Sequence, residues 1–173
     1  MTGTVLANLL RFVLLVLLQA LVLDHVDLAN GWVVPYLYVL FILLLPFNTP
    51  AWATLLLGFT LGMVMDFFSS TPGMHASACT VMAYARLLML RALTPREGYD
   101  AGKRPVVQHM GMAWFMTYGG TLVLVHHLTL FFLEVFRFTD AGTTLLRALM
   151  SAAATLMLCL LAQAFVRRDA WMR

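Results

Sequence analysis

Hydrophobic and polar positions along this chain are segregated into long blocks and do not alternate residue by residue. Six long apolar runs are separated by short stretches that contain charged residues, proline or glycine. Because a helix needs roughly 20 residues to cross a hydrocarbon core of about 30 Å, each run is a candidate crossing. The pattern predicts an all-α integral membrane protein with six transmembrane helices in one bundle. We expect these helices at about residues 6–23, 33–47, 52–68, 73–93, 110–136 and 143–166.

The first two runs each allow a second interpretation. The first run, Leu6 to Leu23, exceeds the hydrophobic region of about 7 to 15 residues found in a signal peptide, and no small-residue cleavage motif follows it. We expect it to be retained as a helix. The run at 33–47 is shorter than a full crossing and ends in the double-proline stretch "LPFNTPAW", so a re-entrant segment is the alternative. Trp32, Tyr36 and Tyr38 are expected to be interfacial aromatics around it.

Composition supports a membrane protein and limits its partners. Of the 173 residues, 62% are hydrophobic and 11% are charged, which predicts one membrane domain over residues 1–173 with no sizeable aqueous domain. The net charge is +3, but lysine and arginine collect at helix ends and form no basic stripe with aromatic residues. We therefore expect contact with membrane lipid and no nucleic-acid partner. Cys79 and Cys159 have no cysteine or histidine at metal-ligand spacing and are interpreted as buried structural residues.

The positions of the basic residues predict the orientation. Arg96, Lys103 and Arg104 lie in the polar loop 94–109, and further arginines lie in the C-terminal tail. The connections after the first and third runs contain no lysine or arginine. Because basic loops stay in the cytoplasm, six crossings place the 94–109 loop and both termini inside.

The stretch "GFTLGMVMD" contains the candidate site. Gly58, Gly62 and Asp66 are four residues apart, so they share one stripe of the third helix. The glycines are expected to let another helix approach closely, and Asp66 is expected to face that helix and not the lipid. The structural interpretation is a tight helix contact with one polar anchor. The functional interpretation is a ligand, ion or proton site, because a carboxylate within a membrane span is energetically costly.

Two other residues are expected at the depth of Asp66. His75 lies in the first turn of the next helix, and Arg147 lies one to two turns into the sixth. The hypothesis is a buried polar cluster of Asp66, His75 and Arg147 that fixes how three helices meet. Arg86 is expected to extend toward the inner surface with its apolar stem in the membrane.

Metal binding and catalysis find little support in the sequence. His126 and His127 are adjacent and therefore point about 100° apart on a helix, and HExxH spacing is absent. Glu134 is expected to pair with Arg137, three residues on. No nucleophile, nucleotide or redox motif is present, so we expect no catalytic residues, no metal, no cofactor and no enzyme activity.

The segment "LLLGFTLGMVMDFFSSTPGMHASACTVMAYA" resembles the core signature of the bacterial rod shape-determining protein MreD family. That family has a glycine-rich third helix, an aspartate near its end, a short turn, and a Gly-x-His-Ala start to the next helix. The residues that occupy these places here are Gly58, Gly62, Asp66, Pro72, Gly73, His75 and Ala76. The likeness covers about 30 residues, and the rest of the chain agrees in hydropathy.

The resemblance implies a non-enzymatic scaffold of the cell-elongation machinery in the bacterial inner membrane. Partners implied are an MreC-like membrane protein, the RodA and PBP2 synthase pair, and MreB filaments, all serving lateral peptidoglycan synthesis and rod cell shape. It also implies the fold of the substrate-binding subunits of energy-coupling-factor (ECF) vitamin transporters, with a groove that holds a partner helix. The alternative function is that of such a subunit itself, which would bind a vitamin or other small solute through Asp66 and His75 from an outward-facing pocket.

Overall fold

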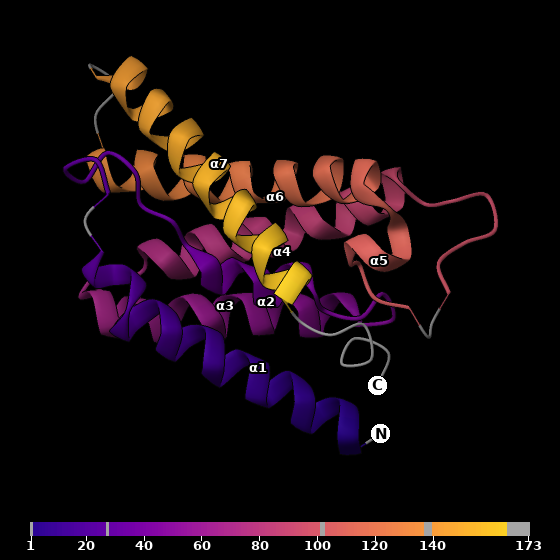
Figure 1. Ribbon diagram of the computed structural model, residues 1–173. Helices are drawn as coiled ribbons and strands as arrows, with labels where there is room; N and C mark the ends of the chain where they lie inside the picture. The colour runs from indigo at the N-terminus through magenta and orange to yellow at the C-terminus, as the bar shows by residue number, and fades with distance from the viewer. Residues whose placement is uncertain (1, 27, 101–102, 137–139, 166–173) are drawn as a thin grey trace.

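The structure is a computed structural model that describes residues 2–26, 28–100, 103–136 and 140–165 (Figure 1). Its five long helices are α1 (Thr2–Leu21), α3 (Ala51–Ser69), α4 (Met74–Ala92), α6 (Met112–Val135) and α7 (Ala141–Phe165). Each lies within a few residues of a predicted helix. The short elements are η1 (Leu23–His25), η2 (Leu37–Val39), α2 (Leu40–Leu43) and α5 (Val107–Met110). The described residues include no β-strand, so the all-helical prediction is confirmed.

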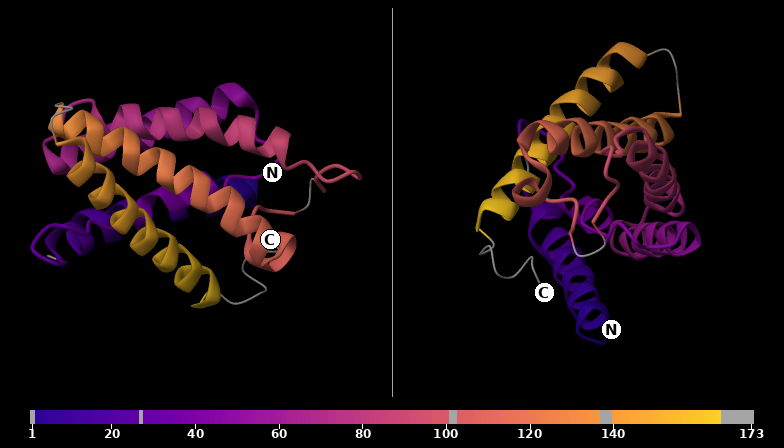
Figure 2. Two further views of the ribbon diagram at one scale, coloured as in Figure 1. Left: turned by 90° about the horizontal axis from the view of Figure 1, so that it is seen from above. Right: turned by 90° about the vertical axis from the view of Figure 1, so that its right-hand side faces the viewer.

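The long helices form one bundle around a shared core. Helix α4 packs between α3 and α6, α7 packs on α6, and α1 contacts α3. Helices α3 and α4 run alongside each other, whereas α1, α6 and α7 are inclined to this pair (Figures 1 and 2).

Four of the described helices are long and apolar enough to cross a membrane: Leu6–His25, Ala51–Ser69, Met112–Val135 and Ala141–Phe165. This is as expected for a membrane protein. Helix α4 does not reach that hydropathy because it carries His75, Thr80, Arg86 and Arg91. Its position between α3 and α6 explains how a more polar helix is accommodated, since its His75 and Arg86 side chains are buried against protein.

The prediction of one helix over 33–47 is wrong. Residues 33–50, hereafter the central segment, contain only η2 and the four-residue α2, joined to irregular chain. Pro35 and Pro46 bracket these turns, and proline lacks the N–H group that a helix interior requires. Tyr38, expected at the membrane interface, is fully buried.

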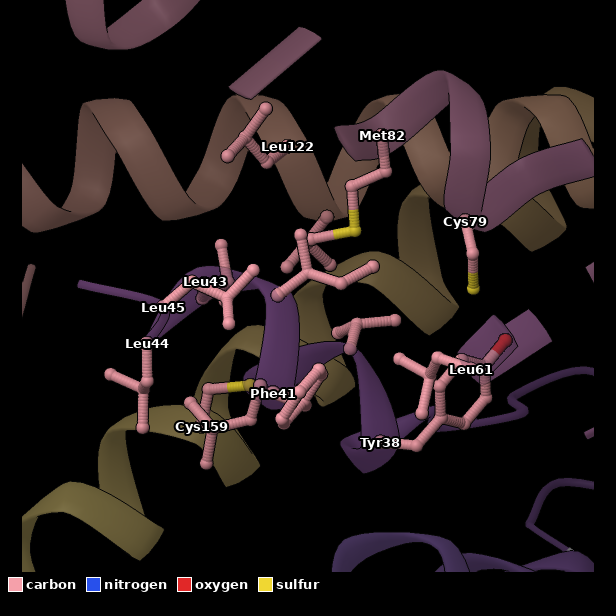
Figure 3. Close-up of a cluster of buried hydrophobic side chains, with 14 of the residues drawn as sticks. Tyr38, Phe41, Leu43, Leu44, Leu45, Leu61, Cys79, Met82, Leu122 and Cys159 are labelled. Carbon is pink, nitrogen blue, oxygen red and sulfur yellow. The ribbon is translucent and has the colours of Figure 1, made fainter. Parts of the chain in front are cut away.

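The central segment nevertheless runs from one end of the bundle to the other (Figure 1). Extended chain advances about 3.3 Å per residue against 1.5 Å in a helix, so a short irregular segment can match the length of α3. Every residue from Leu37 to Leu45 is at most 7% exposed. Figure 3 shows side chains of this segment among those of the surrounding helices, including Leu61, Met82, Leu122 and Cys159.

The connections divide between the two ends of the bundle. The start of α1, α5 and the loop before it, and the end of α7 lie at one end (Figure 1). The end of α1, the α3–α4 turn and the start of α7 lie at the other, which we call the outer end. The basic loop 94–109 is thus on the side where the sequence predicts the cytoplasm.

Candidate functional site

Asp66 closes the turn between α3 and α4. Its Oδ1 accepts hydrogen bonds from the Thr71 hydroxyl at 3.0 Å and from the His75 N–H at 2.9 Å. Its Oδ2 accepts from the N–H groups of Gly73 and Ala76, both at 3.0 Å. The first N–H groups of a helix have no partner within the helix, and its N-terminus attracts negative charge. Asp66, 5% exposed, therefore caps the N-terminus of α4.

The two glycines bring α3 against α4, as predicted. A Cβ atom on Gly58 would lie 2.8 Å from the Cβ of Ala83 and 3.0 Å from the carbonyl oxygen of Cys79. A Cβ atom on Gly62 would overlap the backbone of His75 and Ala76. The close helix contact is therefore internal to this chain, and neither glycine is open to a partner helix.

The expected cluster of Asp66, His75 and Arg147 forms only in part. Asp66 and His75 meet, but through the backbone of His75, and the imidazole ring turns to another partner. Arg147 instead donates to Glu134 at 3.1 Å and lies 4.5 Å from the centre of the Phe131 ring. Both oxygens of Asp66 already accept two hydrogen bonds each from the α3–α4 turn and the start of α4, so Asp66 does not need Arg147 as a partner. The predicted partner of Glu134, Arg137, lies outside the described residues.

Three polar side chains that sequence reasoning missed hold the first half of the central segment. Gln19 of α1 accepts from the Leu37 N–H at 2.7 Å and donates to the Pro35 carbonyl at 3.1 Å. On α7, the Ser151 hydroxyl accepts from the Val34 N–H at 3.0 Å, and the Thr155 hydroxyl accepts from the Tyr36 N–H at 2.9 Å. All three side chains belong to fully buried residues. They supply the partners that an irregular backbone lacks away from water.

Arg86 holds the other half, and the expectation that it extends to the inner surface is wrong. The residue is fully buried. Its Nη2 donates to the carbonyls of Leu45 at 2.6 Å and Pro46 at 3.2 Å, and its Nε donates to the Tyr118 hydroxyl at 3.0 Å. Tyr118 in turn donates to the Leu43 carbonyl at 3.0 Å. The carbonyls of Leu45 and Pro46, just after the C-terminus of α2, therefore face a cation, which is the favoured charge near a helix C-terminus.

The histidine pair on α6 is buried and bonded to protein. His126 contacts the Tyr38 hydroxyl at 2.8 Å, and His127 contacts the Val123 carbonyl at 2.8 Å and the Thr155 hydroxyl at 3.1 Å. Among the described residues, no group of three or more histidine, cysteine or acidic side chains is placed to hold a metal ion. The rings pack as a layer around Tyr36, whose ring centre is 5.4 to 5.8 Å from those of His75, His126 and His127.

A pocket of about 630 Å³ opens at the outer end, above this aromatic layer. It falls in the size range of small-molecule sites. The residues of this outer pocket that carry polar or titratable groups include Asp24, Tyr36, His75, Glu134 and Arg147. His75 and Arg147 thus both line this pocket, although they do not bond to each other, and Asp66 does not line it.

The fold and its buried groups define an all-helical protein with an irregular segment through its core and an outer pocket. No protein-family model, curated protein or solved structure matches this chain.

Proposed function

We propose that the chain is a non-catalytic scaffold of the bacterial cell-elongation machinery, similar to MreD, in the inner membrane. In this proposal it crosses the membrane six times, with the central segment as the second crossing, and resembles the ECF substrate-binding subunits. Both termini lie in the cytoplasm. The partners would be an MreC-like protein, the RodA and PBP2 synthase pair, and MreB filaments.

The saturation of Asp66 is the observation that carries this proposal. A carboxylate that accepts four hydrogen bonds from one turn has its acceptor capacity committed to structure. The family-like residues Gly58, Gly62 and Asp66 thus build a rigid α3–α4 hairpin. The other buried polar groups, from Gln19 to Thr155, bind the central segment of the same chain. A framework of this kind is suited to presenting surfaces to other proteins.

Helix α1 is the surface that we assign to a partner. Only 22% of its apolar 18-residue stretch is buried inside the protein, against 44% of the corresponding stretch of α6. Leu6, Leu10 and Leu14, on one face, are 67%, 65% and 56% exposed. A single helix of an MreC-like protein would find there a continuous apolar stripe that does not take part in the core of the bundle.

Copurification tests the proposal. The tagged protein is purified in mild detergent with co-expressed MreC-like and synthase partners, and Leu6, Leu10 and Leu14 are replaced by alanine together. We expect the triple variant to fold but to lose most of the bound partner. A matched triple variant of the exposed α7 residues Leu145, Leu149 and Met157 should retain it. Failure of every elongation protein to copurify with the wild type would contradict the scaffold role.

The outer pocket favours a second function, small-solute binding by a transporter subunit. The pocket offers His75, Tyr36 and the Glu134–Arg147 pair. A panel of vitamins would be added to the purified protein and its melting temperature measured. This function would replace the scaffold role if two results were obtained together. A vitamin would raise the melting temperature of the wild type but not of Arg147→Met, and no elongation protein would copurify.

A further inference from the structure

The hydroxyl group of Tyr38 lies between two histidine rings. Its oxygen is 2.8 Å from Nδ1 of His75 and 2.8 Å from Nε2 of His126. Tyr38 and His126 are fully buried, and His75 is 3% exposed. A hydroxyl has one proton, so between two neutral rings it donates to one nitrogen and accepts an N–H from the other.

The surroundings of His126 fix the direction of this hydrogen-bond chain. Its Nδ1 atom is buried and has no partner among the described residues. A proton on Nδ1 would leave an N–H group orphaned in the core, which folded proteins avoid more strictly than an unused acceptor. His126 therefore carries its proton on Nε2 and donates it to Tyr38. Tyr38 then donates to Nδ1 of His75, whose own proton is on Nε2.

His75 is the end of the chain that reaches the outer pocket, whereas His126 does not line it. Every element around His75 brings charged or titratable groups. These are Asp24 after α1, Asp66 on α3, Cys79 on α4, Tyr36 and Tyr38 of the central segment, His126, His127 and Glu134 on α6, and Arg147 on α7. The three carboxylates supply opposite charge for a protonated ring, and the pocket supplies a route for the proton.

We propose that the hydrogen-bond chain of His75, Tyr38 and His126, hereafter the latch, responds to protons. It couples the pH at the outer face to how firmly the central segment is held in the core. A proton on Nδ1 of His75 turns an acceptor into a donor. Tyr38 then accepts from both rings, and its own O–H turns to the Cys79 sulfur, which is within its hydrogen-bonding reach (Figure 3). Sulfur is a weak acceptor, so a strong buried hydrogen bond is exchanged for a weak one.

The sign of the effect follows from which state binds the proton. The closed latch requires neutral His75, so protonation favours the loosened state. The latch is complete at neutral pH and weakens as the outer pH falls through the titration of His75. This property goes beyond the scaffold role, which needs no response to pH, so the two can fail independently.

Nuclear magnetic resonance of ¹⁵N-histidine-labelled protein in nanodiscs tests the chain directly, because ¹⁵N shifts distinguish the two tautomers. At about pH 8, above the ordinary histidine range, we expect both His75 and His126 as Nε2–H tautomers. As the pH is lowered stepwise to about 4, well below that range, His75 should become doubly protonated before His126 does. Either ring found as the Nδ1–H tautomer at high pH, or His75 unchanged throughout, would overturn the proposal.

Hydrogen exchange in proteoliposomes tests the consequence. After correction for intrinsic rates, acidifying the outer-facing side should lower the protection of amides 36–40. We expect a change of about tenfold, which is what a difference of one pKa unit for His75 between the closed and loosened states produces. His75→Asn keeps an acceptor near the Nδ1 position but cannot titrate, so its protection should not change with pH, whereas the exposed His25→Asn should behave as wild type. Tyr38→Phe should be unlatched at every pH. An equal pH response in His75→Asn or in Tyr38→Phe, or a response to the other side alone, would overturn the latch.

Discussion

The Nη2 atom of Arg86 lies 2.6 Å from the carbonyl oxygen of Leu45, so a buried cation on α4 holds the end of a segment that is not a helix. Replacement of Arg86 by methionine leaves the Leu45 and Pro46 carbonyls without this donor. An orphaned buried acceptor costs about 1–3 kcal/mol, and removal of a desolvated charge offsets part of that. We expect Arg86→Met to lower the free energy of unfolding by about 1–3 kcal/mol.

The control for this variant is Arg91→Met, one and a half turns later on α4, where the side chain is exposed. A surface substitution is expected to change stability by less than about 0.5 kcal/mol. Equal effects of the two substitutions in a denaturation experiment in detergent would contradict the role of Arg86.

Asp66→Asn should destabilise the α3–α4 hairpin. The asparagine amide would present N–H groups to the N–H groups of Gly73 and Ala76, and the negative charge at the start of α4 would be lost. Hydrogen bonds to a charged group contribute about 1.5–3 kcal/mol, so we expect a loss of that size. Asp140→Asn, exposed just before α7, is the control. Thermal unfolding that does not separate the two variants would rule out the capping role.

Gly62→Ala should cost stability, whereas Gly120→Ala should not. The added Cβ at Gly62 would overlap backbone of α4, and overpacking of this kind costs about 1–3 kcal/mol. At Gly120 the Cβ would meet only the Leu156 side chain at 3.6 Å, an ordinary contact. Alanine there gains up to about 1 kcal/mol of helix propensity. Opposite signs in the unfolding free energies are the expected result, and similar signs would contradict the packing at α3–α4.

Thiol labelling in intact cells tests the orientation. Cysteine is introduced at exposed Glu97 or Asp140 after the buried Cys79 and Cys159 are replaced by alanine. A membrane-impermeant maleimide should label position 140 from outside and position 97 only after the cells are opened. The reverse pattern would invert the proposed topology.

Much of the fold could be predicted because hydropathy and helix-ending residues indicate directly where helices lie. Apolar runs bounded by charges, prolines and glycines gave helix ends within a few residues for α3, α4, α6 and α7. The glycine stripe correctly predicted the close contact of α3 with a neighbouring helix. The family resemblance and its partners remain predictions.

The central segment could not be predicted from hydropathy, because a buried irregular segment and a helix both read as an apolar run. The shortness of the run and its prolines indicated a re-entrant segment as the alternative, and further signal lies in other helices. Gln19, Ser151 and Thr155 are polar residues within apolar runs, and buried polar groups need partners. Arg86 was misjudged for a related reason, since its distance from the helix end says nothing about an acceptor on a neighbouring segment.

The most direct test of the account is amide hydrogen exchange at single-residue resolution across the central segment. The central claim is that individual side chains, and not a helix, protect this backbone. We predict that Gln19→Leu deprotects the Leu37 amide, and that Thr155→Val deprotects the Tyr36 amide, each without loss of the rest of the fold. Thr60→Val, on the exposed face of α3, should deprotect neither. Uniform helical protection from 34 to 46 that survives both substitutions would contradict the claim.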